Sequence, residues 1–295
     1  MTDAGWILTL TCEDRVGIVA AVSGFLAVRG GFILDSQQYA DLETGRFFMR
    51  VLFTGGDSDG QGDVSDDVPD GGGALRTAFA PVAARFAFDW SLTGADRKPR
   101  VLIAVSRGSH CLNDLLHRWR TGTLAVEIAG VVSNHDSLRP LVEWHGLPWH
   151  HLPVDEGRRD AQERAIEALM AQAGADLLVL ARYMQVLSSG FARRLAGRCI
   201  NIHHSFLPGF KGARPYHRAH ERGVKLIGAT AHFVTGDLDE GPIIEQAVER
   251  VDHRASVEDF IRIGRDIEAQ VLARAVNAFG ERRLFLNGGR TVVFQ

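Results

Sequence analysis

Two adjacent histidines and an asparagine lie within one short stretch, Ile200–Phe210, which reads INIHHSFLPGF. Successive side chains of a β-strand point to opposite faces, so a strand here places Asn201 and His203 on one face and turns His204 to the other. An amide donor beside an imidazole can bind a carbonyl oxygen on which negative charge develops. The pattern therefore indicates a site for acyl or formyl transfer.

A second polar stretch, HFVTGDLDEGPII, supplies His232, Asp237 and Asp239 on what we predict to be a loop bounded by glycines. A carboxylate on such a loop can orient a water molecule and set the charge of a neighbouring imidazole. The spacing alone leaves three interpretations of the histidines open. They are catalytic without a metal, they are buried structural groups, or they bind zinc together with other histidines and an acid. The zinc set would combine His203 or His204 with His217, His220 and Asp239.

The chain as a whole has the composition of a soluble globular protein, with 295 residues of which 45% are hydrophobic and 23% charged. Its formal net charge of -3 gives no support to nucleic-acid binding, which needs a basic face. No segment approaches the ~18 apolar residues of a membrane span, and the start, MTDAGWILTL, lacks the pattern of a signal peptide. The three cysteines are far apart, which indicates neither a disulfide framework nor a CxxC metal site. We therefore expect a cytoplasmic protein without membrane or nucleic-acid partners.

The order of apolar patterns predicts two α/β domains of different class. Residues 1–95 read as β-α-β-β-α-β, a ferredoxin-like order that includes a hairpin around Thr44-Gly45. From residue 100 the pattern changes to alternating strands and helices, which indicates a Rossmann-like, mostly parallel sheet over 100–295. The charged segment ADRKPR joins the two. The first helix should bury a stripe consisting of Ile18, Val22, Phe25 and Leu26.

The predicted strands of the larger domain are VLIAVS, VEIAGVVSN, WHHLPV, ADLLVLA and CINIHH. Open α/β sheets bind ligands beyond the carboxyl ends of their strands, so we expect the site among SRGSH, SNHDS, ARYMQVLS and NIHHSFLPG. No GxGxxG or GxxxxGK[ST] nucleotide fingerprint is present. A late helix should begin after Ser256, whose spacing to Asp259 is that of a capping box.

The segment Thr54–Gly73 is rich in aspartate and glycine and contains no basic residue, so we predict a solvated acidic loop. Its DSDGQGD stretch faintly resembles a calcium-binding loop. Val68 stands where such a loop needs a bidentate glutamate, which favours the simpler interpretation.

Two long stretches, NIHHSFLPGFKGARPYHRA and GATAHFVTGDLDEGPIIEQ, closely resemble the formyltransferase-fold enzymes that handle 10-formyltetrahydrofolate. The doubled histidine, the stretch SRGSHCLNDLLHRW and an ACT-like N-terminal LTCEDRVGIVAAVSGFL are most similar to the formyltetrahydrofolate deformylase branch. The resemblance implies an enzyme that hydrolyses its substrate, 10-formyltetrahydrofolate, without a metal ion or a cofactor. It assigns the catalytic roles to Asn201, His203 and Asp239. The alternatives are formyl transfer to an amine acceptor and a protein that senses an amino acid or folate without catalysis.

The same resemblance implies a folate pocket. Its residues are Met184, Gln185, Val186, Leu187, His232 and Asp237. The competing interpretation of Val186 and Leu187 is that they are core residues at the start of a helix. Lys211 and Arg214 are either solvated or hold the glutamate tail of the substrate or a neighbouring loop.

The ACT-like domain implies an amino-acid effector at the CEDRVG turn, where free N–H groups at the start of a helix can bind a carboxylate. The residues concerned are Asp14, Arg15, Gly17 and Ile18. Val16 replaces the proline usual in this turn. The competing interpretation is a domain used only for oligomer contacts. Because ACT sheets commonly pair side by side, we expect a homo-oligomer, a tetramer or larger.

Overall fold

The computed structural model describes residues 5–55, 72–154, 159–209 and 215–295. The predicted acidic loop therefore lies largely outside the described residues, as do Lys211 and Arg214. The chain divides into two compact units, one of Met1–Lys98 with Phe294–Gln295 and the other of Pro99–Val293. Within the described residues, no helix is long and apolar enough to cross a membrane.

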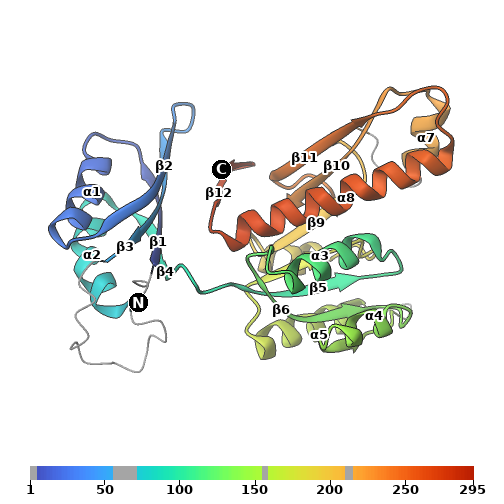
Figure 1. The fold of residues 1–295 in the computed structure, drawn as a ribbon, viewed down its shortest axis with the longest axis horizontal. Helices are drawn as coiled ribbons and strands as arrows, with labels where there is room; N and C mark the ends of the chain where they lie inside the picture. The colour runs from blue at the N-terminus through green and yellow to red at the C-terminus, as the bar shows by residue number, and fades with distance from the viewer. Residues whose placement is uncertain (1–4, 56–71, 155–158, 210–214) are drawn as a thin grey trace. The chain divides into compact units, whose positions relative to one another are not determined.

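The first unit is an antiparallel four-stranded sheet with two helices (Figure 1). Its strands lie in the order β2-β3-β1-β4, and the chain runs β-α-β-β-α-β as predicted. The elements are β1 (Gly5–Glu13), α1 (Ile18–Val28), β2 (Phe32–Asp41), β3 (Arg46–Thr54), α2 (Gly73–Phe86) and β4 (Asp89–Gly94).

The spacing of apolar residues along the chain explains how the core of this unit forms. The predicted stripe of α1 is buried in a core with alternate residues of β3, namely Phe47, Met49, Val51 and Phe53. Gly45 has a φ of 65° in the turn between β2 and β3, a conformation that glycine adopts at little cost. The predicted hairpin is thus confirmed.

The second unit is a seven-stranded sheet in the order β11-β10-β9-β8-β5-β6-β7. The five predicted strands are present and parallel to one another. They are β5 (Arg100–Val105), β6 (Glu127–Ser133), β7 (Trp149–His151), β8 (Leu177–Leu180) and β9 (Cys199–His203). Two further strands, β10 (Leu226–Phe233) and β11 (Ile243–Arg250), extend the sheet in antiparallel fashion beside β9.

The sequence analysis did not identify β10 or β11. Much of β10, LIGATAHF, consists of small residues and glycine, which have weak strand preference. The strand is nevertheless almost wholly buried, because it lies between β9 and β11 and helix α8 (Val257–Gly280) crosses it (Figure 1). The prediction that His232 lies on a loop is therefore wrong, since His232 belongs to β10.

Helices cover both faces of this sheet. Alternate residues of β5 divide between two cores, with Val101 and Ile103 packed among residues of α3 and α8 and Leu102 packed among residues of α5 and α6. The predicted capping box is confirmed, since Ser256 caps α8 and exchanges hydrogen bonds with Asp259. The helices are α3 (His110–Arg120), α4 (Arg139–Trp144), α5 (Arg159–Ala173), α6 (Ser189–Arg194), α7 (Pro215–Glu221) and α8 (Val257–Gly280), and a small hairpin, β12 (Leu284–Asn287) with β13 (Arg290–Val293), follows.

Candidate active site

Glu268 is a buried carboxylate on α8 that holds three other side chains. Only 1% of it is exposed, and it accepts hydrogen bonds from His110 Nε2 at 2.8 Å and Tyr216 Oη at 2.6 Å. The Nε of Arg182 lies 3.3 Å away. Burial tends to raise the pKa of Glu268, but these hydrogen bonds and the guanidinium charge outweigh it and lower the pKa. The sequence analysis missed Glu268, although an acid between Ile267 and Val271 on the apolar stripe of α8 was a signal.

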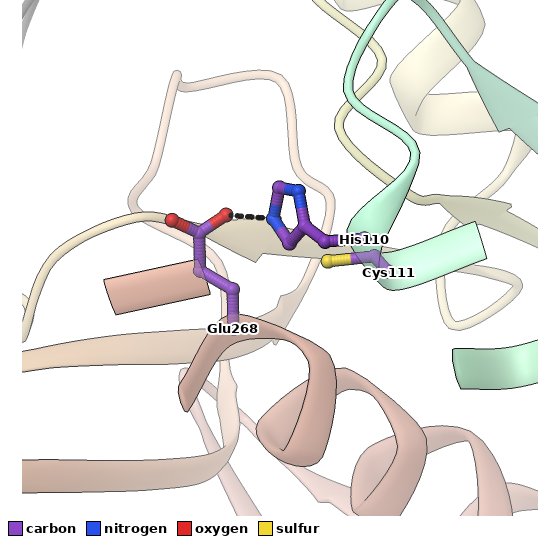
Figure 2. A group of neighbouring side chains, drawn as sticks. All are labelled: His110, Cys111 and Glu268. Carbon is purple, nitrogen blue, oxygen red and sulfur yellow. Dashed lines mark hydrogen bonds and ion pairs between the residues drawn. The ribbon is translucent and has the colours of Figure 1, made fainter. Parts of the chain in front are cut away.

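The same cluster is where a metal ion would have to bind. Among the described residues, His110, Cys111 and Glu268 form the group that could hold a metal ion (Figure 2). Each offers one ligand atom, and the three atoms lie within 4.8 Å of one another. Cys111 is fully buried, and burial together with the charge of Glu268 raises the pKa of its thiol well above the usual value. An ion would have to deprotonate this thiol and displace Arg182 from Glu268. The cluster therefore favours an ion-paired network over a metal centre.

The zinc set that the spacing left open is not assembled in the described residues. His217 and His220 are exposed on α7, and the ring of His220 packs on Phe260. No metal-binding group in this part of the chain joins them to His203.

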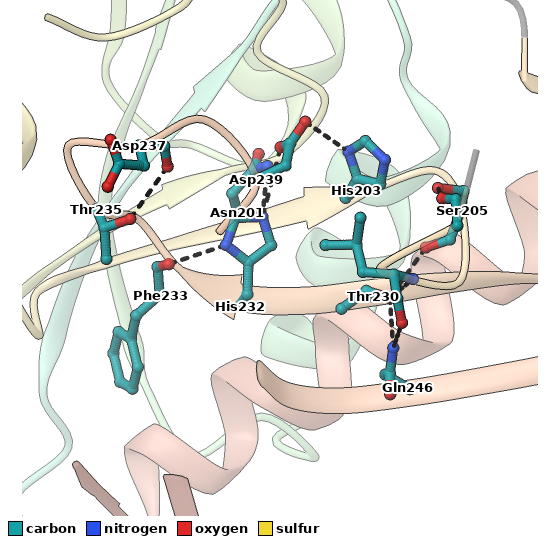
Figure 3. Close-up of polar contacts among 12 residues, drawn as sticks. Asn201, His203, Ser205, Thr230, His232, Phe233, Thr235, Asp237, Asp239 and Gln246 are labelled. Atoms are coloured by element: carbon teal, nitrogen blue, oxygen red, sulfur yellow. Dashed lines mark hydrogen bonds and ion pairs between the residues drawn. The ribbon is translucent and has the colours of Figure 1, made fainter. Parts of the chain in front are cut away.

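The structure does bring Asn201, His203 and Asp239 together, with His232 beside them (Figure 3). Asn201 and His203 lie two positions apart on β9, and β10 pairs His232 opposite Asn201. Asp239, from the loop between β10 and β11, places Oδ2 at 3.2 Å from His203 Nδ1 and Oδ1 at 3.7 Å from His232 Nε2. Asn201 Nδ2 lies 3.3 Å from His232 Nε2.

The two ring nitrogens of His203 differ in their contacts. Its Nδ1 faces the Asp239 carboxylate, which only accepts, so Nδ1 carries a hydrogen. Its Nε2 is buried and has no hydrogen-bond partner among the described residues. A buried polar atom without a partner is costly, and such atoms cluster where a ligand supplies the missing bond. His203 is therefore poised to bind an incoming polar group.

Asp239 remains ionised in this setting. Burial tends to raise the pKa of its carboxyl, but the contact with His203 outweighs burial and holds that pKa well below its usual range. Its φ of 56° lies in the left-handed region, which aspartate and asparagine tolerate better than most residues. Asp237 is exposed, and its backbone oxygen accepts hydrogen bonds from Thr235 Oγ1 at 3.1 Å and from the Glu240 N–H at 3.4 Å. The structure therefore brings Asp239, and not Asp237, to the histidines.

Thr230 fixes the chain that follows His203. The Thr230 hydroxyl is fully buried, donates to the carbonyl of Ser205 at 2.9 Å and accepts from Leu207 N–H at 3.0 Å. The Gln246 amide donates to the same hydroxyl at 2.9 Å (Figure 3). These bonds hold the segment after β9 rigidly against β10 and β11. No pattern in the sequence indicated this role for Thr230 or Gln246.

The predicted folate segment, 184–187, is an exposed loop fixed at both ends. At one end the Met184 N–H donates to Ser106 Oγ at 2.9 Å, and at the other the Ser188 N–H donates to Glu163 at 2.6 Å. Between these anchors, the backbone groups of Gln185, Val186 and Leu187 make no hydrogen bond within the described residues. Val186 is 54% exposed, which excludes a core role for it, whereas Leu187 packs partly on the core.

A cavity of about 340 Å³ lies beside this loop. Met184 and Gln185 form part of its wall, and Glu268 and its partners form another part. Its remaining lining residues include Ser106, Arg107, Asn134, His135 and Arg265. This cavity offers cationic and neutral donors at the carboxyl ends of β5, β6 and β8, where an open α/β sheet binds its ligands.

The turn before α1 carries the four residues expected to bind an effector. Gly17 has a φ of 99° and starts α1 without a side-chain cap. Asp14 is exposed, whereas Arg15 donates to the Arg85 carbonyl at 2.8 Å and lies over the ring of Phe86. The side chain of Ile18 is buried in the core, so only its backbone could contribute to binding. The structure thus places Asp14, Arg15 and Gly17 on one exposed turn.

The orientation of His204 differs from the one expected from the alternation of side chains along a strand. Because β9 ends at His203, the chain turns and the ring of His204 lies 4.9 Å from the ring of His203, centroid to centroid. Burial, followed by the nearby charges of Arg182 and His203, lowers the pKa of His204 from 6.5 to about 4. His204 is therefore neutral near neutral pH and lies beside the ring of His203.

This shift predicts that acid destabilises the folded chain. The unfolded state binds the His204 proton more tightly, so its contribution to stability is complete above pH 6.5 and is lost as the pH falls towards 4. The expected loss is at most about 3 kcal/mol. Urea unfolding at pH 7 and pH 4.5 should show a smaller difference in His204→Gln than in the unsubstituted chain. His217→Gln removes an exposed histidine and should leave the pH dependence of the free energy of unfolding unchanged. The same loss of stability between pH 7 and pH 4.5 in all three proteins would refute the role given to His204.

Comparisons with known proteins agree with this architecture. Residues 99–276 match the family model described as formyl transferase. The formyltetrahydrofolate deformylase of Corynebacterium sp. (strain P-1) is 50% identical over 289 residues, covering 98% of this chain and 98% of that protein. A crystal structure of the deformylase from Pseudomonas syringae pv. tomato superimposes with a TM-score of 0.91 at 47% identity, covering 100% of this chain and 96% of that one. The glycinamide ribonucleotide transformylase 1 of Symbiobacterium toebii matches 67% of this chain and 95% of its own, with a TM-score of 0.63 at 31% identity.

Proposed function

The chain belongs to the formyltetrahydrofolate deformylase family, and from that premise we propose that it hydrolyses 10-formyltetrahydrofolate to formate and tetrahydrofolate at the site around Asp239. One observation carries the assignment of the site. The Nε2 of His203 is buried and unpartnered among the described residues, while an ionised carboxylate holds the opposite nitrogen of the same ring. We propose that the reaction needs neither a metal ion nor a cofactor, since the polar groups already present can perform each step.

In the proposed mechanism, Asn201 Nδ2 and the protonated Nε2 of His203 donate to the formyl oxygen. Water attacks the formyl carbon, so a C–O bond forms and the C–N10 bond then breaks. One water proton leaves through Asp239 and is returned to N10, which gives tetrahydrofolate and formic acid, and the formic acid loses the remaining water proton to the solvent as formate. A preorganised donor aimed at the developing oxyanion lowers the barrier by about 3–4 kcal/mol. Asp239 also compensates the charge of His203.

The loop 184–187 is the proposed pteridine site. Backbone groups of Gln185 and Leu187 would bind the polar edge of the ring, and the absence of hydrogen bonds to them within the described residues supports this role. Exposed Met184 and Val186 would supply apolar contacts. His232 and Asp237 were also expected to contact the substrate, and this expectation remains a prediction.

The decisive experiment separates hydrolysis from transfer. Purified protein given 10-formyltetrahydrofolate alone should release formate at the full rate without any amine acceptor. Addition of EDTA should change that rate by less than about twofold, because no step of the proposed mechanism uses a metal ion. Tetrahydrofolate formation that requires an added amine, with the formyl group recovered on that amine instead of as formate, would favour formyl transfer, for which the cavity of about 340 Å³ beside Met184 could bind an acceptor.

We further propose a homo-oligomer formed through the first unit, with an amino-acid effector bound at the CEDRVG turn. β2 is an edge strand of its sheet, and it exposes Phe32 by 69%, Leu34 by 54% and Tyr39 by 47%. An exposed apolar edge strand favours pairing with another copy of the same strand. We expect this oligomer to be a tetramer or larger and to act in the cytoplasm. Elution of the purified chain as a 32.3 kDa monomer at micromolar concentration would contradict it.

A further inference from the structure

The ring of His232 is fixed by its neighbours in one tautomer. His232 is 2% exposed, and its Nδ1 lies 2.8 Å from the backbone oxygen of Phe233. A carbonyl oxygen only accepts, so Nδ1 carries a hydrogen and Nε2 of the neutral ring carries a lone pair. Gly241 packs against this contact, since a Cβ there would lie 1.7 Å from the Phe233 oxygen and 3.2 Å from His232 Nδ1. The chain around His232 thus determines which nitrogen faces the active site.

The charges of the site indicate that His232 is neutral. One carboxylate, Asp239, faces two buried imidazoles and can compensate only one buried positive charge. Its contact with His203 is 3.2 Å, whereas its contact with His232 is 3.7 Å and too long for a hydrogen bond. Because the proposed mechanism places the charge on His203, a second imidazolium at His232 would be buried without compensation.

A neutral His232 determines the orientation of the Asn201 amide. The lone pair of His232 Nε2 lies 3.3 Å from Asn201 Nδ2 and can accept one of its two hydrogens. If the amide oxygen of Asn201 lay in that place instead, its lone pair would face the lone pair of His232 Nε2. No other hydrogen bond of the Asn201 side chain is found in the described part of the chain. The second N–H therefore remains for a ligand.

From this geometry we infer that His232 is a positioning residue: it holds the amide of Asn201 with its nitrogen towards the reacting carbonyl. This inference rests on the proposed function, in which Asn201 donates to the formyl oxygen. It differs from a direct contact between His232 and the folate, which would change substrate affinity. A residue that acts only through Asn201 should change kcat and leave KM nearly unchanged.

A double-mutant cycle tests the inference. His232→Leu removes the acceptor while keeping an apolar side chain of similar size, and we expect kcat to fall by about 10–100-fold with KM within about threefold. In an Asn201→Ala background, where the amide is absent, His232→Leu should cause no further fall. Effects that multiply would overturn the inference, because His232 would then act through Asp239 or through the fold. Normal kcat in Asn201→Ala alone would overturn both the proposed role of Asn201 and this inference.

A conservative variant guards against a failure of folding. In His232→Gln the amide oxygen can accept from Asn201 Nδ2, so kcat should recover to within about fivefold of the unsubstituted chain. Activity as low as that of His232→Leu in a correctly folded His232→Gln would contradict the inference. His145→Leu, which removes a partly buried histidine at the end of α4, serves as the matched control and should keep normal kcat.

Discussion

Replacement of Asp239 with asparagine is expected to lower kcat for 10-formyltetrahydrofolate by about 10³-fold, or about 4 kcal/mol of barrier. Asparagine keeps the shape of the side chain and tolerates the φ of 56° at this position, so the loop should keep its conformation. It loses the negative charge that compensates His203 and the base that accepts the water proton. The measurement is steady-state formate release, with tetrahydrofolate affinity expected to change by less than about threefold.

The matched control for this variant is Asp252→Asn. Asp252 is also a carboxylate with a lowered pKa, about 2, because Arg254 bonds to it, but it lies exposed at the end of β11. The same chemical change there should leave kcat unaltered. Near-normal turnover in Asp239→Asn would remove the central assignment of the site, whereas equal losses in both variants would point to a general effect on the fold.

Glu268→Gln is expected to destabilise the second unit by about 3–5 kcal/mol, because it removes one partner from a buried ion pair and leaves the other without compensation. Glutamine fills the same space but leaves the guanidinium of Arg182 without its counter-charge and His110 without a carboxylate. For a unit of this size the loss corresponds to a fall in Tm of roughly 10 °C. Thermal unfolding followed by circular dichroism measures it.

Glu167→Gln provides the comparison. Glu167 forms a two-point ion pair with Arg194, but both side chains are about half exposed, and solvent screening leaves such pairs with little net effect on stability. Its Tm should therefore stay within a few degrees of the unsubstituted chain. A Glu268→Gln variant as stable as Glu167→Gln would show that the cluster around Glu268 does not support the fold.

Much of the fold could be predicted because it is encoded over short distances along the chain. The stripe of α1, the hairpin at Gly45 and the capping box of Ser256 each depend on residues a few positions apart. The strands β10 and β11 could not be predicted in this way. The sequence of β10 shows weak strand preference, and its conformation is imposed by pairing with β9 and β11 and by burial under α8. β11 is held in turn by its pairing with β10.

The candidate site also combines features that the local sequence predicts with features that depend on long-range contacts. By itself the sequence determined that Asn201 and His203 share a face of β9, because side chains alternate along a strand, and its resemblance to a known family pointed to Asp239. Only the tertiary structure decided how close Asp239 lies to His203 and His232, that His232 on β10 lies opposite Asn201, and that Glu268 joins residues up to 158 positions away. The physical reason is that these contacts join distant segments, and the register of the sheet and the packing of α8 set their distances.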